Sequence, residues 1–94
     1  MKFYALLDAV DQNVTRTLIL ANRSSSGLEI ASFHRLPKCW YADPAAMTFL
    51  VEEPWRLREL SAGQASALAS EWGAKIPDAK ELAGLPPVPA FELD

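Results

Sequence analysis

The chain contains few of the residues on which disulfides, metal centres and nucleophilic catalysis depend. Its 94 residues include one cysteine, Cys39, and one histidine, His34. A lone cysteine excludes an intrachain disulfide and a cysteine-rich metal site, and these two residues with Asp43 do not supply the four ligands of a structural zinc site. No nucleotide-binding motif is present either. We therefore expect no metal and no cofactor.

Long hydrophobic runs are also missing. The longest, residues 18–21 and 45–51, are far shorter than the roughly 20 residues that a membrane-spanning helix needs. Asp8 and Asp11 interrupt the apolar residues that follow Lys2, so a secretory signal is not expected. We predict a cytoplasmic protein that does not enter a membrane, and a single cysteine agrees with a reducing compartment.

The sequence contains fewer basic than acidic side chains. Nine Lys and Arg against twelve Asp and Glu leave a formal net charge of -3, which disfavours direct binding of nucleic acid through its phosphates. Residues 1–42 carry five basic and three acidic side chains, a balance of +2, whereas residues 43–94 carry four basic and nine acidic ones, a balance of -5. The second half therefore predicts an acidic surface, suited to a basic protein partner.

Two β-strands joined by a polar turn are the clearest pattern in the first part of the chain. Residues 15–21 are rich in β-branched and apolar side chains, residues 22–27 have turn chemistry, and residues 28–35 mix apolar with charged side chains. Residues 2–10 fit a strand or an apolar helical stripe, and we favour the strand. With a turn at 11–13, it completes a three-stranded meander.

The strongest helix signal runs from Ala62 to Trp72. Ser61 and Gln64 have the spacing of a capping box, apolar residues follow at helical intervals, and Gly73 supplies the residue that ends the helix. Together with the strands, this helix predicts an α+β domain. A small antiparallel sheet of three to five strands would pack against one amphipathic helix.

Three segments between these elements are less sharply defined. Residues 38–42 predict an aromatic connection that follows the end of the third strand. Residues 45–51 fit either a helix that Asp43 begins or a strand, and the pattern does not decide between them. Residues 55–60 alternate like a half-buried strand, with Trp55 on the core side.

The C-terminal third predicts a short helix and an extended segment. Pro77 and Asp78 begin the helix, which runs through Leu82. We expect residues 1–84 to form a single α+β domain. Residues 85–94 would be an extended, proline-rich C-terminal segment.

His34, Cys39 and Asp43 are the one set that combines a nucleophile with a base and an orienting carboxylate. A thiol enzyme is the functional interpretation of this set. The structural interpretation is a hydrogen-bonded strand histidine and a small buried cysteine. Since no further feature supports catalysis, we predict that the protein is not an enzyme.

Trp40, Tyr41, Glu52 and Glu53 are the candidate partner-binding residues. Large aromatic side chains are enriched at binding hot spots, but Trp40 and Tyr41 are equally well explained as a lid on the core. Glu52 and Glu53 contribute to the acidic surface, for which the structural explanation is simple solvation.

These patterns predict a small, acidic, non-enzymatic protein-binding module. Inhibitors and immunity-type proteins of bacterial or phage origin have this size and charge, and they act by occupying a partner's surface. The partner expected here is another protein, such as a basic nucleic-acid-handling protein. The first alternative is a homodimer or assembly subunit formed by sheet-edge pairing. The second, a thiol enzyme built on Cys39 and His34, has less support.

Overall fold

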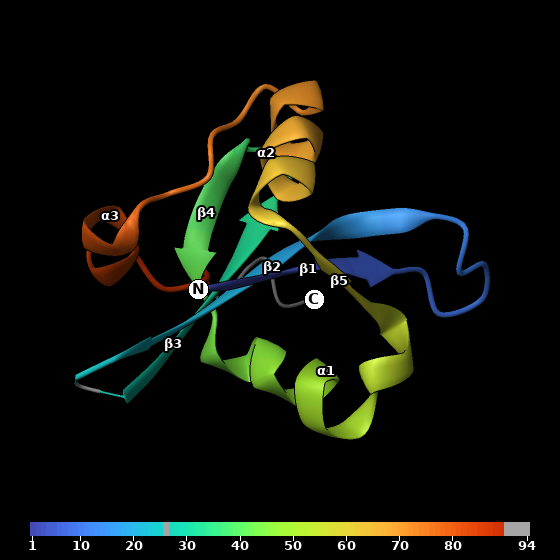
Figure 1. Ribbon diagram of the computed structural model, residues 1–94, viewed down its shortest axis with the longest axis horizontal. Coiled ribbons are helices and arrows are strands. Elements are labelled where there is room, and N and C mark those ends of the chain that lie inside the picture. The colour runs from blue at the N-terminus through green and yellow to red at the C-terminus, as the bar shows by residue number, and fades with distance from the viewer. Residues whose placement is uncertain (26, 90–94) are drawn as a thin grey trace.

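Five antiparallel strands and several short helices build an α+β fold (Figure 1). The computed structural model describes residues 1–25 and 27–89. The strands lie in the order β4-β3-β2-β1-β5. The elements are β1 (Lys2–Leu7), β2 (Thr15–Ser24), β3 (Gly27–His34), β4 (Cys39–Ala42), the 3-10 turn η1 (Pro44–Ala46), α1 (Met47–Glu52), the 3-10 turn η2 (Pro54–Arg56), β5 (Leu57–Leu60), α2 (Ala62–Glu71) and α3 (Ala79–Ala83).

The first four strands form a meander, and β5 pairs with β1 at the edge of the sheet opposite β4. The predicted strand at the N-terminus and the predicted hairpin are confirmed. The turn is shorter than the expected 22–27, because Ser24 pairs with Gly27 and the ladder continues to that point. Gly27 has a φ of +127°, a conformation that favours glycine.

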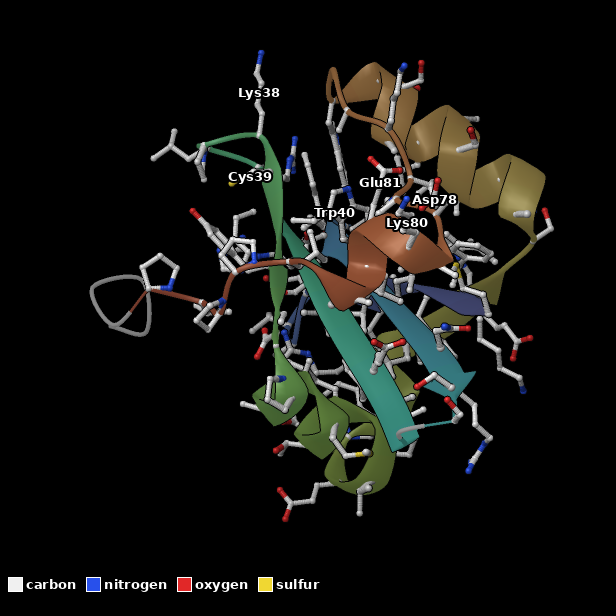
Figure 2. The ribbon with its side chains drawn as sticks, turned by 90° about the vertical axis from the view of Figure 1, so that its left-hand side faces the viewer. Lys38, Cys39, Trp40, Asp78, Lys80 and Glu81 are labelled. Atoms are coloured by element: carbon white, nitrogen blue, oxygen red, sulfur yellow. The ribbon has the colours of Figure 1, made fainter. Side chains whose placement is uncertain are left out.

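Residues 38–42 contain strand β4, where a connection had been expected. Lys38 has a φ of +56° and closes the turn after β3, so the chain reverses at once and pairs antiparallel with β3. Because strand side chains alternate between faces, Trp40 and Cys39 point to opposite sides of β4 (Figure 2). Strand pairing therefore gives each of these side chains a defined face.

Both faces of the sheet are apolar, and each has its own cover. Leu18, Ile19 and Leu20 follow one another in β2, yet none is more than 1% exposed. Leu18 and Leu20 face α2 and the segment that follows it, and Ile19 faces η1 and α1. The expected arrangement of a sheet on one helix is therefore incomplete, because a second layer closes the other face (Figure 1).

Helix α2 confirms the strongest sequence prediction. The amide of Gln64 donates to Oγ of Ser61 at 3.1 Å, and the amide of Ser61 donates to Oε1 of Gln64 at 2.9 Å, which completes the capping box. Ala65 and Ala69 are fully buried against the sheet. Gly73, with a φ of +73°, ends the helix as expected.

The undecided segment 45–51 is helical. Met47, Phe49 and Leu50 of α1 pack on the sheet face that Ile19 occupies. Tertiary packing decides the outcome here, because the segment is too short for local helix propensity to do so. The helix is therefore a cover for the second apolar face.

Trp55 does not lie in the core, contrary to expectation. Pro54 begins the 3-10 turn η2, and strand β5 starts only at Leu57. A proline suits the first position of such a turn because it lacks an amide hydrogen. The turn breaks the alternation on which the prediction depended, and it leaves Trp55 50% exposed.

The predicted short helix near the C-terminus is confirmed as α3. Asp78 and Glu81 form a second capping box, with the amide of Glu81 donating to Oδ1 of Asp78 at 2.8 Å and the amide of Asp78 donating to Oε1 of Glu81 at 3.1 Å (Figure 2). Leu82, which ends the expected helix, is buried in the α2-side core.

The chain after α3 runs along the outer edge of β4. The amide of Ala42 donates to the carbonyl of Pro86 at 2.8 Å, and the amide of Val88 donates to the carbonyl of Ala42 at 3.2 Å. These bonds occupy polar groups that an edge strand would otherwise expose. Residues 90–94, the end of the predicted proline-rich segment, lie outside the described residues.

Replacing Ser61 by Ala removes the side-chain acceptor at the start of α2. We expect the free energy of unfolding to fall by about 1 kcal/mol, measured by urea denaturation. Ser70→Ala is the control: this exposed position lies inside α2, where alanine is the better helix former. Equal stabilities of the two variants would show that the capping box does not stabilise the helix.

A carboxylate organises the loop between β1 and β2. Oδ2 of Asp8 accepts from the amides of Val10 and Asp11, both at 3.0 Å. Hydrogen bonds to the charged form hold the pKa of Asp8 below its usual 3.8, with the Asp11 amide the larger cause and the Val10 amide next.

The lowered pKa of Asp8 predicts a pH-dependent contribution to stability. Because the pKa of Asp8 is lower in the folded state, its ionised carboxylate stabilises the fold at pH values above the unfolded-state pKa of 3.8. This stabilisation is lost as the pH falls through the folded-state pKa. We expect Asp8→Asn, which cannot titrate, to lose stability relative to the wild type at neutral pH and to approach it below pH 3.8. Urea unfolding over a pH series measures this difference, and a difference independent of pH would contradict the assignment.

Candidate functional site

Three polar side chains on the α1 face of the sheet form one hydrogen-bonded chain. Oγ of Ser32 donates to Oδ2 of Asp43 at 2.8 Å and lies 3.0 Å from Nε2 of His34. Ser32 and His34 share a face because they are two residues apart in β3. A serine hydroxyl has one hydrogen, and here it is directed at Asp43, so Nε2 of His34 is assigned as the donor to Ser32.

These side chains border a small cavity of about 210 Å³. Small-molecule sites in proteins usually have volumes of about 300–1,000 Å³, so this one is small. Ser32 is buried, with 6% of its surface exposed. The apolar part of the wall comes mainly from Leu6, Ile19, Ala46 and Phe49.

The order of the hydrogen bonds among Ser32, His34 and Asp43 differs from that in a hydrolytic triad. In a triad, histidine accepts the proton of the nucleophile and the carboxylate orients the histidine. Here Ser32 stands between the other two, and Asp43 accepts from the hydroxyl. The network satisfies a buried hydroxyl and orients His34.

The structure brings Cys39 next to this network. Cys39 lies opposite His34 in the β3–β4 ladder and shares its face. The imidazole also has other partners: Nε2 lies 3.0 Å from Oγ of Ser32, and the ring meets the Tyr41 ring edge-on with centroids 4.8 Å apart. Cys39 is thus paired with His34 across the ladder, and Ser32 links His34 to Asp43.

Ser32 was missed by the sequence analysis. Its signal is a polar residue between Ile30 and His34 on one face of a predicted strand. Serine is common at exposed strand positions, so the pattern alone does not distinguish a buried hydroxyl from a solvated one.

Trp40 is a core residue. Its ring centroid lies 5.4 Å from that of Phe33, its Nε1 donates to the carbonyl of Lys75 at 2.9 Å, and only 8% of its surface is exposed. Figure 2 places the ring between β4 and the segment that leads to α3. We therefore remove Trp40 from the candidate partner surface. Tyr41 lies on the opposite face of β4 and is half-buried.

Glu52 and Glu53, by contrast, lie at an accessible corner. Glu52 is exposed at the end of α1, and Glu53 lies 3.5 Å from the guanidinium of Arg56. Val51 is 71% exposed and Trp55 50% exposed beside them. We call Val51, Glu52, Glu53 and Trp55 the α1–η2 corner. It combines two of the four predicted residues with an aromatic side chain that had been assigned to the core.

Within residues 1–25 and 27–89, no three His, Cys, Asp or Glu side chains are grouped so as to hold a metal ion. In the same residues, no helix has the length and apolar character needed to cross a membrane.

The geometry around Cys39 predicts that His34 does not activate its thiol. We expect His34→Gln to leave the rate of Cys39 alkylation by iodoacetamide unchanged within roughly twofold at neutral pH, because the imidazole Nε2 is bonded to Ser32. Mass spectrometry of the folded protein measures the rate, and the urea-unfolded protein supplies the reference. A fall of an order of magnitude in the variant would instead identify a thiol–imidazole pair.

Comparison with known proteins supplies no relative from which a role could be transferred. No family model matches the chain, and neither a curated protein nor a solved structure matches it. The proposals below therefore depend on the residues, contacts and charges of this chain.

Proposed function

We propose that this protein is a non-enzymatic protein-binding module that docks its α1–η2 corner onto a basic partner. Trp55 carries the proposal, because it is the one aromatic residue among the exposed large apolar side chains of residues 1–25 and 27–89. Tryptophan is enriched at binding hot spots, since its large rigid surface gains much on burial. Val51, 71% exposed, extends the apolar area.

The corner stands on a rigid support. Nε of Arg56 donates to the carbonyl of Leu7 at 3.0 Å, which ties η2 to β1. The same guanidinium lies 5.1 Å from the ring centroid of Phe49, whose side chain packs on the sheet. A side chain held in position before binding loses less conformational entropy when a complex forms. Arg56 therefore favours a preformed contact surface around Trp55.

Charge favours a basic partner. Glu52 is exposed, and Glu53 lies beside it at the end of α1. Acidic groups at the rim of an interface attract a basic surface and raise the association rate. Proteins that handle nucleic acids present such surfaces, so we propose one of these as the partner. In this proposal the chain acts in the cytoplasm as an inhibitor or immunity-type protein that covers its partner's surface.

Pairing of two copies at a sheet edge is the alternative, and β5 is the edge that it would use. In antiparallel pairing about a two-fold axis, the central residue faces its own copy. A register centred on Arg58 or Glu59 therefore opposes like charges, and one centred on Leu57 sets Arg56 opposite Arg58. Opposed like charges destabilise a strand pair, so the homodimer has less support.

The proposal predicts a selective effect of Trp55→Ala. We expect affinity for a partner isolated with the wild type to fall at least tenfold, because truncating a hot-spot residue costs about 2 kcal/mol or more. Calorimetric titration of that partner measures the change, and circular dichroism confirms the fold. Glu52→Lys should also weaken binding, with the larger part of its effect on the association rate.

Val10→Ala is the matched control, because Val10 is an apolar side chain, 93% exposed, in the β1–β2 loop. It should leave affinity unchanged. Unaltered binding by Trp55→Ala, with binding lost in Val10→Ala, would place the interface elsewhere and overturn the proposal.

A further inference from the structure

The ladder between β2 and β3 stops before the strands do. Its register pairs Ile19 with Ser32 and, continued by three residues, would set Arg16 directly opposite Arg35. Like charges opposed across an antiparallel pair repel each other. Instead, the hydroxyl of Thr17 donates to the carbonyl of Phe33. The strand ends leave a hollow of about 520 Å³ that both arginines line.

Arg35 is held in place by stacked aromatic rings that begin in the core. Its guanidinium carbon lies 4.3 Å from the ring centroid of Trp72. Trp72 in turn stacks on Phe33, with centroids 5.8 Å apart and planes within 5°, and Phe33 is only 2% exposed. A stacked guanidinium keeps the N–H groups at its edge available for an acceptor. The stack therefore preorganises a cation at the surface.

The positive charge of the hollow is weakly compensated. Arg16 has a carboxylate contact with Asp8, but at 3.8 Å with 63% of the Arg16 side chain exposed. Oδ2 of that carboxylate already accepts from two backbone amides. An exposed pair of this kind contributes little. Glu71 borders a neighbouring hollow together with Arg35 and Lys38, so one further carboxylate and one further cation lie nearby.

We propose that Arg16 and Arg35 form an anion-binding site that takes the phosphoryl group of a phosphate ester. Guanidinium groups match phosphate oxygens in geometry and charge, and both arginines line the same hollow. Thr15 adds a hydroxyl to the lining. Val14 and Leu36, 43% and 97% exposed, border the same hollow and would contact the organic part of the ester. The site shares no residue with the α1–η2 corner and does not depend on the proposed function.

Titration of the ¹⁵N-labelled full chain tests the site, with phenyl phosphate, inorganic phosphate and phenylacetate as separate probes. Phenyl phosphate should give saturable shifts centred on residues 14–17 and 35–36. Inorganic phosphate should bind the same residues more weakly, because it lacks the apolar part. Phenylacetate, with one negative charge, should bind at least tenfold more weakly than phenyl phosphate.

Two variants and one control assign the site. Arg35→Met and Arg16→Met should each weaken phenyl phosphate binding at least tenfold. Arg23→Met removes the same charge from an exposed position near the other end of β2 and should change nothing. If Arg35→Met fails to fold because its stack on Trp72 is lost, Arg16→Met decides alone.

Three results would overturn the site. The first is an absence of saturation at millimolar phenyl phosphate. The second is an equal effect of Arg23→Met, which would indicate non-specific attraction. The third is phenylacetate binding as tight as that of phenyl phosphate, which would remove the preference for a phosphoryl group.

Discussion

Burial of three successive β2 residues on opposite faces of one sheet is the constraint on which the rest of this structure depends. Leu18 and Leu20 point one way and Ile19 the other, and none is more than 1% exposed. Full burial of each such side chain stabilises the fold by about 1.5–3 kcal/mol. Each face therefore needs a cover: α2 and the segment after it cover one face, and η1 with α1 covers the other.

The two covers explain where accessible groups can lie. Closing the second face places α1 on the sheet, and Arg56 then ties η2 to β1. Trp55, one residue earlier in the same 3-10 turn, is directed outward. The first cover, α2 with its C-terminal Trp72, supports the guanidinium of Arg35. Both proposed binding surfaces are therefore at the margins of the two layers, and the small cavity by Ser32 lies beneath the second.

Elements specified by local chemistry could be predicted from the sequence. The capping box at Ser61, the glycine that ends α2 and the polar turn of the hairpin each depend on residues within a few positions of one another. Strand β4 could not be predicted in this way, because its formation depends on pairing with β3. The burial of Trp40 follows from that pairing and from its bond to Lys75, 35 positions away.

Other features required knowledge of the register or of packing. The alternation of Trp55 with Leu57 fits a strand, but the turn that Pro54 begins changes the direction of the first side chain. Arg16 and Arg35 are unremarkable as isolated residues, and it is the fold that brings them to the same hollow. The hydrogen bond of Ser32 likewise depends on Asp43, which lies close to Ser32 only because strand β4 pairs with β3.

The exposure of the three tryptophans measures the central claim most directly. Fluorotryptophan incorporation resolves each side chain by ¹⁹F NMR, and single substitutions by phenylalanine assign the signals. The shift between H₂O and D₂O reports contact with solvent. A closed second face and an outward Trp55 predict the largest solvent shift for Trp55 and the smallest for Trp40, which are 50% and 8% exposed. A solvent-induced shift of Trp55 as small as that of Trp40 would mean that Trp55 belongs to the core, and it would contradict the account.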